Sequence, residues 1–288
     1  MATNNYIRKR VELLVFLSIL SFWPATLWAG IAEIKVATAS SMKLVFEEIG
    51  KEFHDENPEI IVRLSFGSSG NFFSQIVHGA PYDVFFSSDT NYPKQLAKKG
   101  KSLGDTPVAL YAIGRIVLWV PDSVELDVKS KKTNTLLSSK VKKIALANPK
   151  HAPYGRAGIE WMKKSGIYSQ VKSRFVLGEN ISQATQFVHT QAAQAGILAL
   201  SLVGNSKMKS TGSFWEIPKD QHSPIEQGFL ILKDTQNPLA ARSFAEFVTG
   251  PKGTRILKKY GFDPLPVPRP VEGDCCNLPL QTTFPGRN

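Results

Sequence analysis

The sequence predicts an α/β protein with two lobes, each built on a mainly parallel sheet flanked by helices. From Ile34 onward, short β-like runs alternate with amphipathic helical runs, which is the pattern of βαβ units. The alternation occurs in two successive series, and this repetition favours two lobes. A chain of 288 residues with 42% hydrophobic residues is also long enough to bury the cores of two medium domains.

The first series contains three strand-like and three helical runs. The strand-like runs are "IKVAT", "IIVRLSF" and "YDVFFSS", and the second carries apolar residues at every other position. The helical runs are "SMKLVFEEIGKEFHDENP", the run that follows "GSSG", and "NYPKQLAKKG". They end at Asn57-Pro58, Gly79 and Gly100, which are residue types that commonly stop helices.

The second series begins with two predicted strands, "YAIGRIVLWV" and "KKIALANP". A helix in "GRAGIEWMKKSG", a strand in "QVKSRFVLG", a helix in "ISQATQFVHTQAAQA" and a strand in "GILAL" follow. The strand "IEQGFLIL" and the helices "PLAARSFAEFVTG" and "PKGTRILKKYGF" come last. From Pro264 the chain is rich in proline, so residues 264–288 are expected to form an extended tail without a core of its own.

Residues 1–29 have the layout of a secretory signal peptide. A basic start, "MATNNYIRKR", is followed by the apolar run "VELLVFLSILSFW" and by small residues in "PATLWAG". Cleavage is expected after Ala29 or after Ala32, and the mature chain is expected to be exported. An uncleaved membrane anchor is the alternative, but the apolar run is short for a span of about 20 residues.

Charge and residue types narrow the possible partners. The net charge is +11 for the whole chain, and it is +9 without residues 1–29, which favours anionic partners. No Lys/Arg-rich helix occurs, so nucleic acid is not an expected partner. The two cysteines, Cys275 and Cys276, are adjacent and cannot staple a core. The five histidines are scattered without a zinc-binding motif, so no cofactor is expected.

Four predicted strand-to-helix turns share one chemistry. Each places small or hydroxyl-bearing residues at the carboxyl end of a strand, where ligands bind in open α/β sheets. A helix N-terminus has unpaired N–H groups and a partial positive charge, so it is suited to bind an anion. The turns are "TASS" (38–41), "GSSG" (67–70), "APYG" (152–155) and "GENIS" (178–182).

These turns favour anion binding by neutral donors over plain helix capping. Capping alone does not require Gly67 and Gly70 on both sides of a serine pair. None of the four turns contains Lys or Arg, so N–H and O–H groups would hold the anion. Glu179 is the one acid among them and is expected to point away, whereas His151 stands beside "APYG".

A serine nucleophile is the competing interpretation of "GSSG". A nucleophile elbow has the pattern Gly-x-Ser-x-Gly, but Asn71 occupies the position of its last glycine. The match to this pattern fails, so we do not expect the protein to be an enzyme. A serine hydrolase that uses Ser68 or Ser69 is the remote alternative.

Segments around these turns resemble the periplasmic molybdate-binding proteins of ABC transporters. The segments are "FGSSGNFFSQIVHGAPYDVFFSSD", "NPKHAPYGRAG", "GENISQA" and "GPKGTRILKKYGF", and the resemblance extends from about Ile34 to Phe262. It implies the two-lobed periplasmic-binding-protein fold (type II), with a molybdate or tungstate dianion held without countercharges in the inter-lobe cleft. It also implies a monomer in the periplasm that delivers the ion to an inner-membrane ABC permease.

The resemblance implies five ligand-binding residues. Ser40 and Ser41 would bind through hydroxyl and backbone N–H groups, and Ser69 would contribute from "GSSG". Tyr154 and Ile181 would bind through backbone N–H groups. Any contact with molybdenum or tungsten would be made through the oxygens of the ion.

One position departs from part of the family. Some members carry a tyrosine hydroxyl in a strand like "GIVYGSDA", whereas this chain reads "GILALSLV" and has Ala199 at that position. The resemblance therefore implies that the hydroxyl contact is absent here, and Ser201 is not expected to replace it.

Lobe 1 is expected to consist of two chain segments that are separated in sequence by lobe 2. Lobe 1 would comprise residues 32–112 and 226–263, and lobe 2 residues 113–225, with connecting strands near 111–114 and 223–228.

The same fold could bind another oxyanion instead, such as sulfate, thiosulfate or phosphate. An iron carrier is a further alternative, but it would need a pair of tyrosines, and the four turns offer only Tyr154. The sequence leaves the choice between molybdate and tungstate open.

Overall fold

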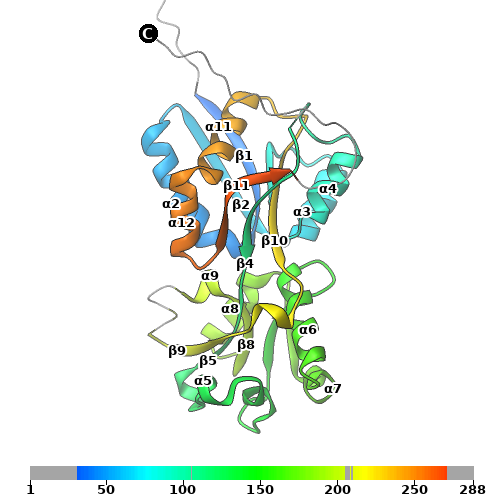
Figure 1. Cartoon of the computed structure of the whole chain (residues 1–288), viewed down its shortest axis with the longest axis vertical. Coiled ribbons are helices and arrows are strands. Elements are labelled where there is room, and N and C mark those ends of the chain that lie inside the picture. Colours follow the sequence, from blue (N-terminus) through cyan, green and yellow to red (C-terminus); the bar gives the residue numbers. More distant parts are fainter. Residues whose placement is uncertain (1–30, 105, 205–207, 209, 271–288) are drawn as a thin grey trace, which may run out of the picture. The chain divides into compact units, whose positions relative to one another are not determined.

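The structure is a computed structural model that describes residues 31–104, 106–204, 208 and 210–270. From Ala32 onward, the described chain forms one compact unit that contains two β-sheets (Figure 1). The predicted signal peptide and the two cysteines lie outside the described residues. Within the described ranges, no helix combines the length and the apolar character that crossing a membrane requires.

The first sheet has six strands in the order β11-β4-β10-β3-β1-β2. β1 pairs in parallel with β2 and with β3. β10 runs antiparallel to both β3 and β4, and β11 runs antiparallel to β4. The strands are β1 (Ala32–Ala39), β2 (Ile60–Gly67), β3 (Val84–Ser87), β4 (Ala109–Gly114), β10 (Ile225–Ile231) and β11 (Asp263–Pro270).

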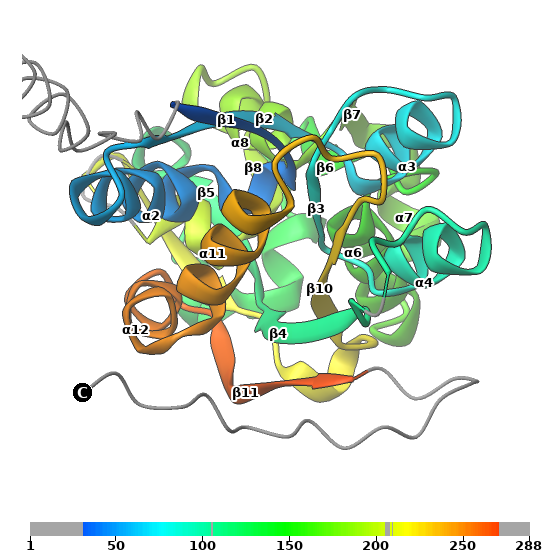
Figure 2. The same cartoon turned by 90° about the horizontal axis from the view of Figure 1, so that it is seen from above.

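Helices cover both faces of the first sheet (Figure 2). One face carries α2 (Lys43–Glu56), α11 (Pro238–Thr249) and α12 (Pro251–Lys259), and the other carries α3 (Ser69–Val77) and α4 (Asn91–Lys98). Successive residues of β1 reach opposite faces, because Val36 packs in the apolar cluster of α2 and α11 while Ala37 packs in that of α3 and α4. Burial on both faces explains why all four residues of β3 are apolar or small and buried.

The second sheet has five strands in the order β7-β6-β8-β5-β9. Its apolar cluster includes Trp119 and Trp161, which are both buried. The strands are β5 (Ile116–Pro121), β6 (Ile144–Ala147), β7 (Phe175–Gly178), β8 (Ala195–Ala199) and β9 (Gly212–Glu216). The helices are α5 (Val128–Lys131), α6 (Pro153–Lys164), α7 (Tyr168–Val171), α8 (Ile181–His189) and α9 (Leu200–Val203). Short 3-10 helices occur in both halves. η2 (Ser40–Met42) follows β1 of the first sheet, and the others are η3 (Asp122–Val124), η4 (Lys132–Leu137), η5 (Lys172–Arg174) and η6 (Lys219–Gln221).

The two-lobed α/β prediction is confirmed, but each sheet is mixed and not mainly parallel. The chain passes from the first sheet to the second between Gly114 and Ile116, and it returns between Glu216 and Ile225. A strand that enters a sheet from the other one starts at the shared boundary, so β5 and β10 run against the strands that end there. These crossings support the predicted lobe boundaries, and the division into lobes remains a proposal.

Three predicted elements differ from the structure. The run "YAIGRIVLWV" is not one strand, because β4 and β5 belong to different sheets. In "QVKSRFVLG" only Phe175–Gly178 is a strand, since the chain first forms α7 and η5, with Val171 buried as their apolar anchor. The predicted tail is not free from its start, because residues 264–270 belong to β11 at the sheet edge, where proline is tolerated.

Candidate functional site

The four predicted turns each follow the carboxyl end of a strand, and their helix N-termini meet at one small cavity. The cavity is small, with a free volume of about 10 Å³ in this structure. All five residues predicted to bind a ligand line it, and no described lining residue has a charged side chain. The lining residues are Ala39, Ser40, Ser41, Gly67, Ser68, Ser69, Ser88, Ala152, Pro153, Tyr154 and Ile181.

Helix capping does not account for the serines at this cavity. Ser68 precedes α3 as its N-cap, but its side chain makes no capping hydrogen bond. The N-cap positions of η2 and α6 are Ala39 and Ala152, whose side chains have no polar atom. Among the N-cap residues of these four turns, Asn180 alone caps its helix, and its side chain accepts a hydrogen bond from the Gln183 backbone N–H at 3.1 Å. Capping therefore does not engage the hydroxyl groups in the first two turns, although Ser68 and Ser69 contact His151 and Ser88.

Ser40 and Ser41 present donors to the cavity because their carbonyl groups are engaged elsewhere. Ser182 Oγ donates to the Ser40 carbonyl at 3.0 Å, and Ser201 Oγ donates to the Ser41 carbonyl at 2.7 Å. Both contacts join the first sheet's turn to residues of the second half. Ser41 is only 1% exposed, and its hydroxyl has no hydrogen-bond partner among the described residues. A buried hydroxyl of this kind is free to donate to a ligand in the cavity.

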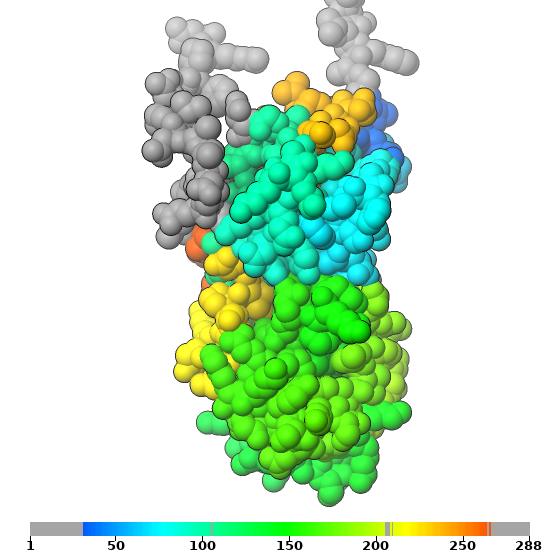
Figure 3. Space-filling view, turned by 90° about the vertical axis from the view of Figure 1, so that its right-hand side faces the viewer, coloured from blue at the N-terminus to red at the C-terminus, as the bar shows by residue number. Residues whose placement is uncertain are grey.

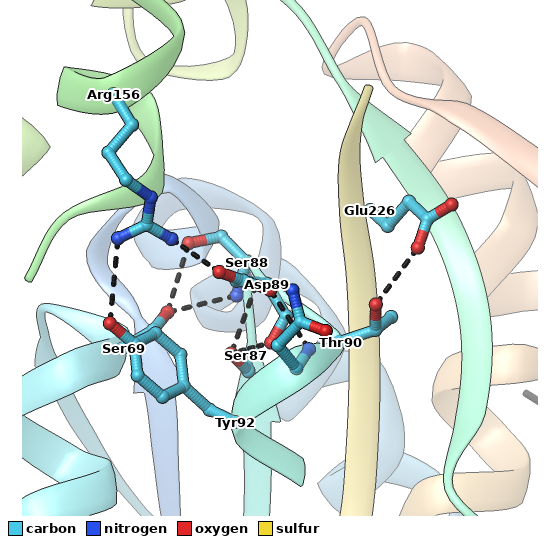
Figure 4. Close-up of polar contacts among 9 residues, drawn as sticks. Ser69, Ser87, Ser88, Asp89, Thr90, Tyr92, Arg156 and Glu226 are labelled. Carbon is cyan, nitrogen blue, oxygen red and sulfur yellow. Dashed lines mark hydrogen bonds and ion pairs between the residues drawn. The ribbon is translucent and has the colours of Figure 1, made fainter. Parts of the chain in front are cut away.

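Ser69 is fully buried and is oriented by Ser88 (Figure 4). The Ser88 backbone N–H donates to Ser69 Oγ at 3.0 Å, and the two hydroxyl oxygens are also 3.0 Å apart. Ser69 Oγ accepts a hydrogen bond from the Ser88 backbone N–H and can accept a second one from the Ser88 hydroxyl. The Ser69 hydroxyl proton is then free to be donated to a ligand. The sequence analysis missed Ser88, although it ends the strand-like run "YDVFFSS" beside the other turns.

Tyr154 and Ile181 begin the two helices that face the cavity from the second sheet. Pro153 is the first residue of α6 and has no N–H, so Tyr154 supplies the first backbone donor of that helix. Ile181 has the same role in α8, directly after its cap. The Tyr154 phenol is also buried, which raises its pKa, although the Ser41 and Gln227 side chains partly oppose this rise.

Two charged residues in or beside the turns, Arg156 and Glu179, contact the first half of the molecule. Arg156, in α6, forms an ion pair with Asp89 of the first half, and its guanidinium also donates to Tyr92 Oη at 3.5 Å (Figure 4). Glu179 does not line the cavity, as predicted, and its carboxylate accepts a hydrogen bond from the Asn71 amide. These pairs keep full charges engaged at the rim while the cavity itself stays neutral.

His151 contacts Ser68, but the geometry is not that of a catalytic triad. His151 Nδ1 lies 3.0 Å from Ser68 Oγ. His151 Nε2 and Glu179 Oε1 are 3.7 Å apart, which is beyond hydrogen-bond reach, so the acid does not orient the ring. Ser69, the other candidate nucleophile, contacts Ser88 and no base among the described residues.

Gly70 is required by the contact between the two halves. A Cβ atom at Gly70 would lie 2.8 Å from His151 Cβ, and the Gly70 N–H donates to the His151 carbonyl at 3.0 Å. Gly67 instead leaves room for the Phe72 ring, which would be 2.9 Å from its Cβ. The structure thus gives both glycines a packing role within the protein.

The two halves are in contact beside the cavity. The cyan and teal surface of α3 and α4 abuts the green surface that carries α6 (Figure 3). Hydrogen bonds from Ser182, Ser201 and Gly70 and the ion pair of Arg156 all cross this boundary. Ala199 is buried in β8 opposite Ile116, and Ser201, which does not line the cavity, holds the Ser41 carbonyl.

Two other features of the described residues give no competing site. A larger depression beside Lys35 and Asp83 lies away from the four turns, and the Asp83 carboxylate there already accepts hydrogen bonds from Lys35 and Thr235. Within the described ranges, no group of three or more His, Cys, Asp or Glu side chains could hold a metal ion.

Comparison with known proteins gives a consistent result. The Azotobacter vinelandii molybdate-binding protein ModA is 35% identical over 234 residues, which cover 81% of this chain and 91% of that protein. The solved structure of the Azotobacter vinelandii periplasmic molybdate-binding protein matches with a TM-score of 0.73 and 34% identity, over 80% of this chain and 98% of that one. The sulfate-binding protein SubI of Mycobacterium tuberculosis H37Rv shares the fold, with a TM-score of 0.66 and 14% identity over 81% of this chain and 87% of that one.

The model of one protein family extends over both sheets. It is described as bacterial extracellular solute-binding protein, and it matches residues 34–263. This range includes all four turns and the cavity between them. The chain therefore belongs to the bacterial extracellular solute-binding protein family.

Proposed function

We propose that this protein is the periplasmic binding component of an ABC transporter, which captures molybdate or tungstate between two lobes and delivers it to an inner-membrane permease. One observation carries the proposal: Ser40, Ser41, Ser69, Tyr154 and Ile181 line a single buried cavity without a charged side chain. The relatives named as molybdate-binding proteins support the choice of ion.

The donor set suits a fully ionised tetrahedral oxyanion. Hydroxyl and backbone N–H groups form charge-assisted hydrogen bonds to a dianion, and each is stronger than a bond between neutral partners. An oxyanion that carries a proton would bring its own O–H group against a donor and would bind less well. The helix N-termini that meet at the cavity add partial positive charge. Binding therefore needs neither Lys nor Arg in contact with the ion.

Capture and release would follow from closure of the lobes. Both halves contribute donors to the same cavity, so a bound ion stabilises the closed arrangement over an open one. No bond of the ion is made or broken in this cycle, so the protein would need no cofactor and would not act as an enzyme. We also propose that it works as a monomer. The proposed signal peptide, with cleavage near Ala29 or Ala32, would bring the chain to the periplasm.

Calorimetric competition among oxyanions tests the choice of ion. The fold alone does not decide it, because a sulfate-binding protein shares the fold. Molybdate and tungstate are larger than sulfate, so a cavity shaped for them would leave sulfate with longer and weaker contacts. We expect molybdate and tungstate to displace sulfate, thiosulfate and phosphate, and to raise the melting temperature most. Equal affinities for molybdate and sulfate would contradict this assignment.

A further inference from the structure

Three buried polar side chains gather behind the cavity, and each has an atom without a partner. Ser41 follows β1, Tyr154 begins α6, and Gln227 lies in β10, the strand that returns from the second sheet. Their exposed fractions are 1%, 1% and 0%. Ser41 Oγ, Tyr154 Oη and Gln227 Oε1 have no hydrogen-bond partner among the described residues. Because buried polar atoms are rarely left unpaired, this cluster calls for a function.

The Tyr154 phenol is held where the chain crosses between the sheets. A Cβ atom at Gly114, the last residue of β4, would overlap Tyr154 Oη and would lie 2.9 Å from Gln227 Nε2. The phenol oxygen and the amide nitrogen therefore flank the same point, and only glycine leaves room for them. Gln227 Nε2 donates one hydrogen to the Ile225 carbonyl at 3.2 Å, so its second hydrogen is left for another acceptor.

Ser41 and Tyr154 line the same cavity, and Tyr154 Oη and Gln227 Nε2 lie against the same point beside Gly114. The Ser41 and Gln227 side chains partly oppose the rise that burial causes in the pKa of Tyr154, although none of these contacts has the distance and angle of a full hydrogen bond. Small movements of the hydroxyl groups would complete such bonds. Because burial keeps the phenol neutral, it retains the proton that it needs to act as a donor.

We propose that Tyr154 Oη is the middle of a directed hydrogen-bond chain that begins at Gln227 and ends on the bound anion. Gln227 Nε2 donates to the phenol oxygen, the phenol donates to Ser41 Oγ, and the Ser41 hydroxyl donates to the ion. Tyr154 is then a positioning residue as well as a backbone donor, since its side chain acts through Ser41. This inference rests on the proposed function.

The direction of the chain explains why the residues are of these types. A serine that accepts a hydrogen bond from the phenol must direct its single proton elsewhere, and the cavity is where an acceptor would lie. Each bond polarises the next one, which strengthens the last donor. The hydrogen-bond chain also joins three elements: β10, α6 of the second sheet and the turn after β1 in the first sheet. It is therefore complete only when the two halves are closed.

Replacing Tyr154 with phenylalanine tests the chain, because the backbone N–H of residue 154 is kept. We expect molybdate affinity, measured by titration calorimetry, to fall about threefold to tenfold, the range for one neutral hydrogen bond. The melting temperature of the ligand-free protein should stay the same or rise, since the lost hydroxyl has no partner there. The matched control is Tyr111→Phe, which removes another buried phenol without a partner and should change affinity less than twofold.

A double-mutant cycle with Ser41→Ala separates positioning from a general effect on packing. Without the Ser41 hydroxyl, Tyr154→Phe should cause no further loss beyond twofold, because the chain is already broken. Losses that add in full, or a lower ligand-free melting temperature with Tyr154→Phe, would overturn the chain. An unchanged affinity of Tyr154→Phe in a wild-type background that binds molybdate would overturn this inference alone. A wild-type protein that binds no oxyanion would overturn the proposed function as well.

Discussion

Replacing Ser69 with alanine is expected to weaken molybdate binding about tenfold to 150-fold while the protein stays folded. The substitution removes one charge-assisted hydrogen bond to the ion, which corresponds to about 1.5–3 kcal/mol. Ser69 is fully buried, so water cannot take over the missing contact. The Ser88 N–H also loses its acceptor, which should lower the stability of the variant without adding to the loss of affinity.

Titration calorimetry with the purified mature chain measures this effect. Ser74→Ala is the matched control, because it removes an exposed serine hydroxyl from the same helix, α3, and should change affinity less than twofold. Circular dichroism should show the same helix content in both variants. An affinity of Ser69→Ala equal to that of the wild type would show that this hydroxyl does not contact the ion.

Adding a methyl group at Gly70 is expected to weaken binding by preventing full closure. The new Cβ would lie 2.8 Å from His151 Cβ and 3.0 Å from His151 Cα, so the two halves would have to separate. Overpacking of this kind costs about 1–3 kcal/mol, and it burdens only the closed form. Gly70→Ala should therefore lower molybdate affinity about fivefold to 150-fold, although every proposed ligand group is still present.

The ligand-free melting temperature distinguishes this mechanism from a folding defect. It should change little in Gly70→Ala, because the new Cβ meets the His151 backbone only across the two halves, and the other close atom, Tyr92 Oη at 2.8 Å, ends a side chain that can shift. The rise caused by molybdate should shrink. Gly50→Ala is the control: its Cβ would meet only Leu64 Cδ1, at an ordinary 3.5 Å, so affinity should be unchanged. Wild-type affinity in Gly70→Ala would contradict the closed contact between Gly70 and His151.

Residue chemistry at strand ends was enough to predict the cavity's lining. Carboxyl ends of parallel strands meet at one edge of a sheet, so turns of the same chemistry could be expected to converge. Ser41, Ser69 and Tyr154, which come from distant parts of the sequence, do line one cavity. Their role as ligands stays a prediction. The order of strands could not be read in the same way, and the antiparallel direction of β5 and β10 follows only from the two crossings between sheets.

Contacts between the two halves were beyond the reach of sequence patterns. Ser182 and Ser201 bind the carbonyl groups of Ser40 and Ser41, but nothing in "GENIS" or "ALSLV" specifies which carbonyl they meet. Gly70 illustrates the same limit, since its neighbour His151 is 81 positions away and becomes close only on closure. Local chemistry thus identified the four turns and the family resemblance identified the individual donors, while the partners that orient them depend on how the halves meet.

The position of the metal in a crystal grown with molybdate tests the central claim most directly. An anomalous difference map at the molybdenum absorption edge locates the ion without any assumption about the protein. The account predicts one strong peak inside the cavity, with the oxygens of the ion near Ser41 and Ser69 on one side and near the Tyr154 and Ile181 N–H groups on the other. A peak outside the cavity, or one held by a lysine or arginine side chain, would contradict it.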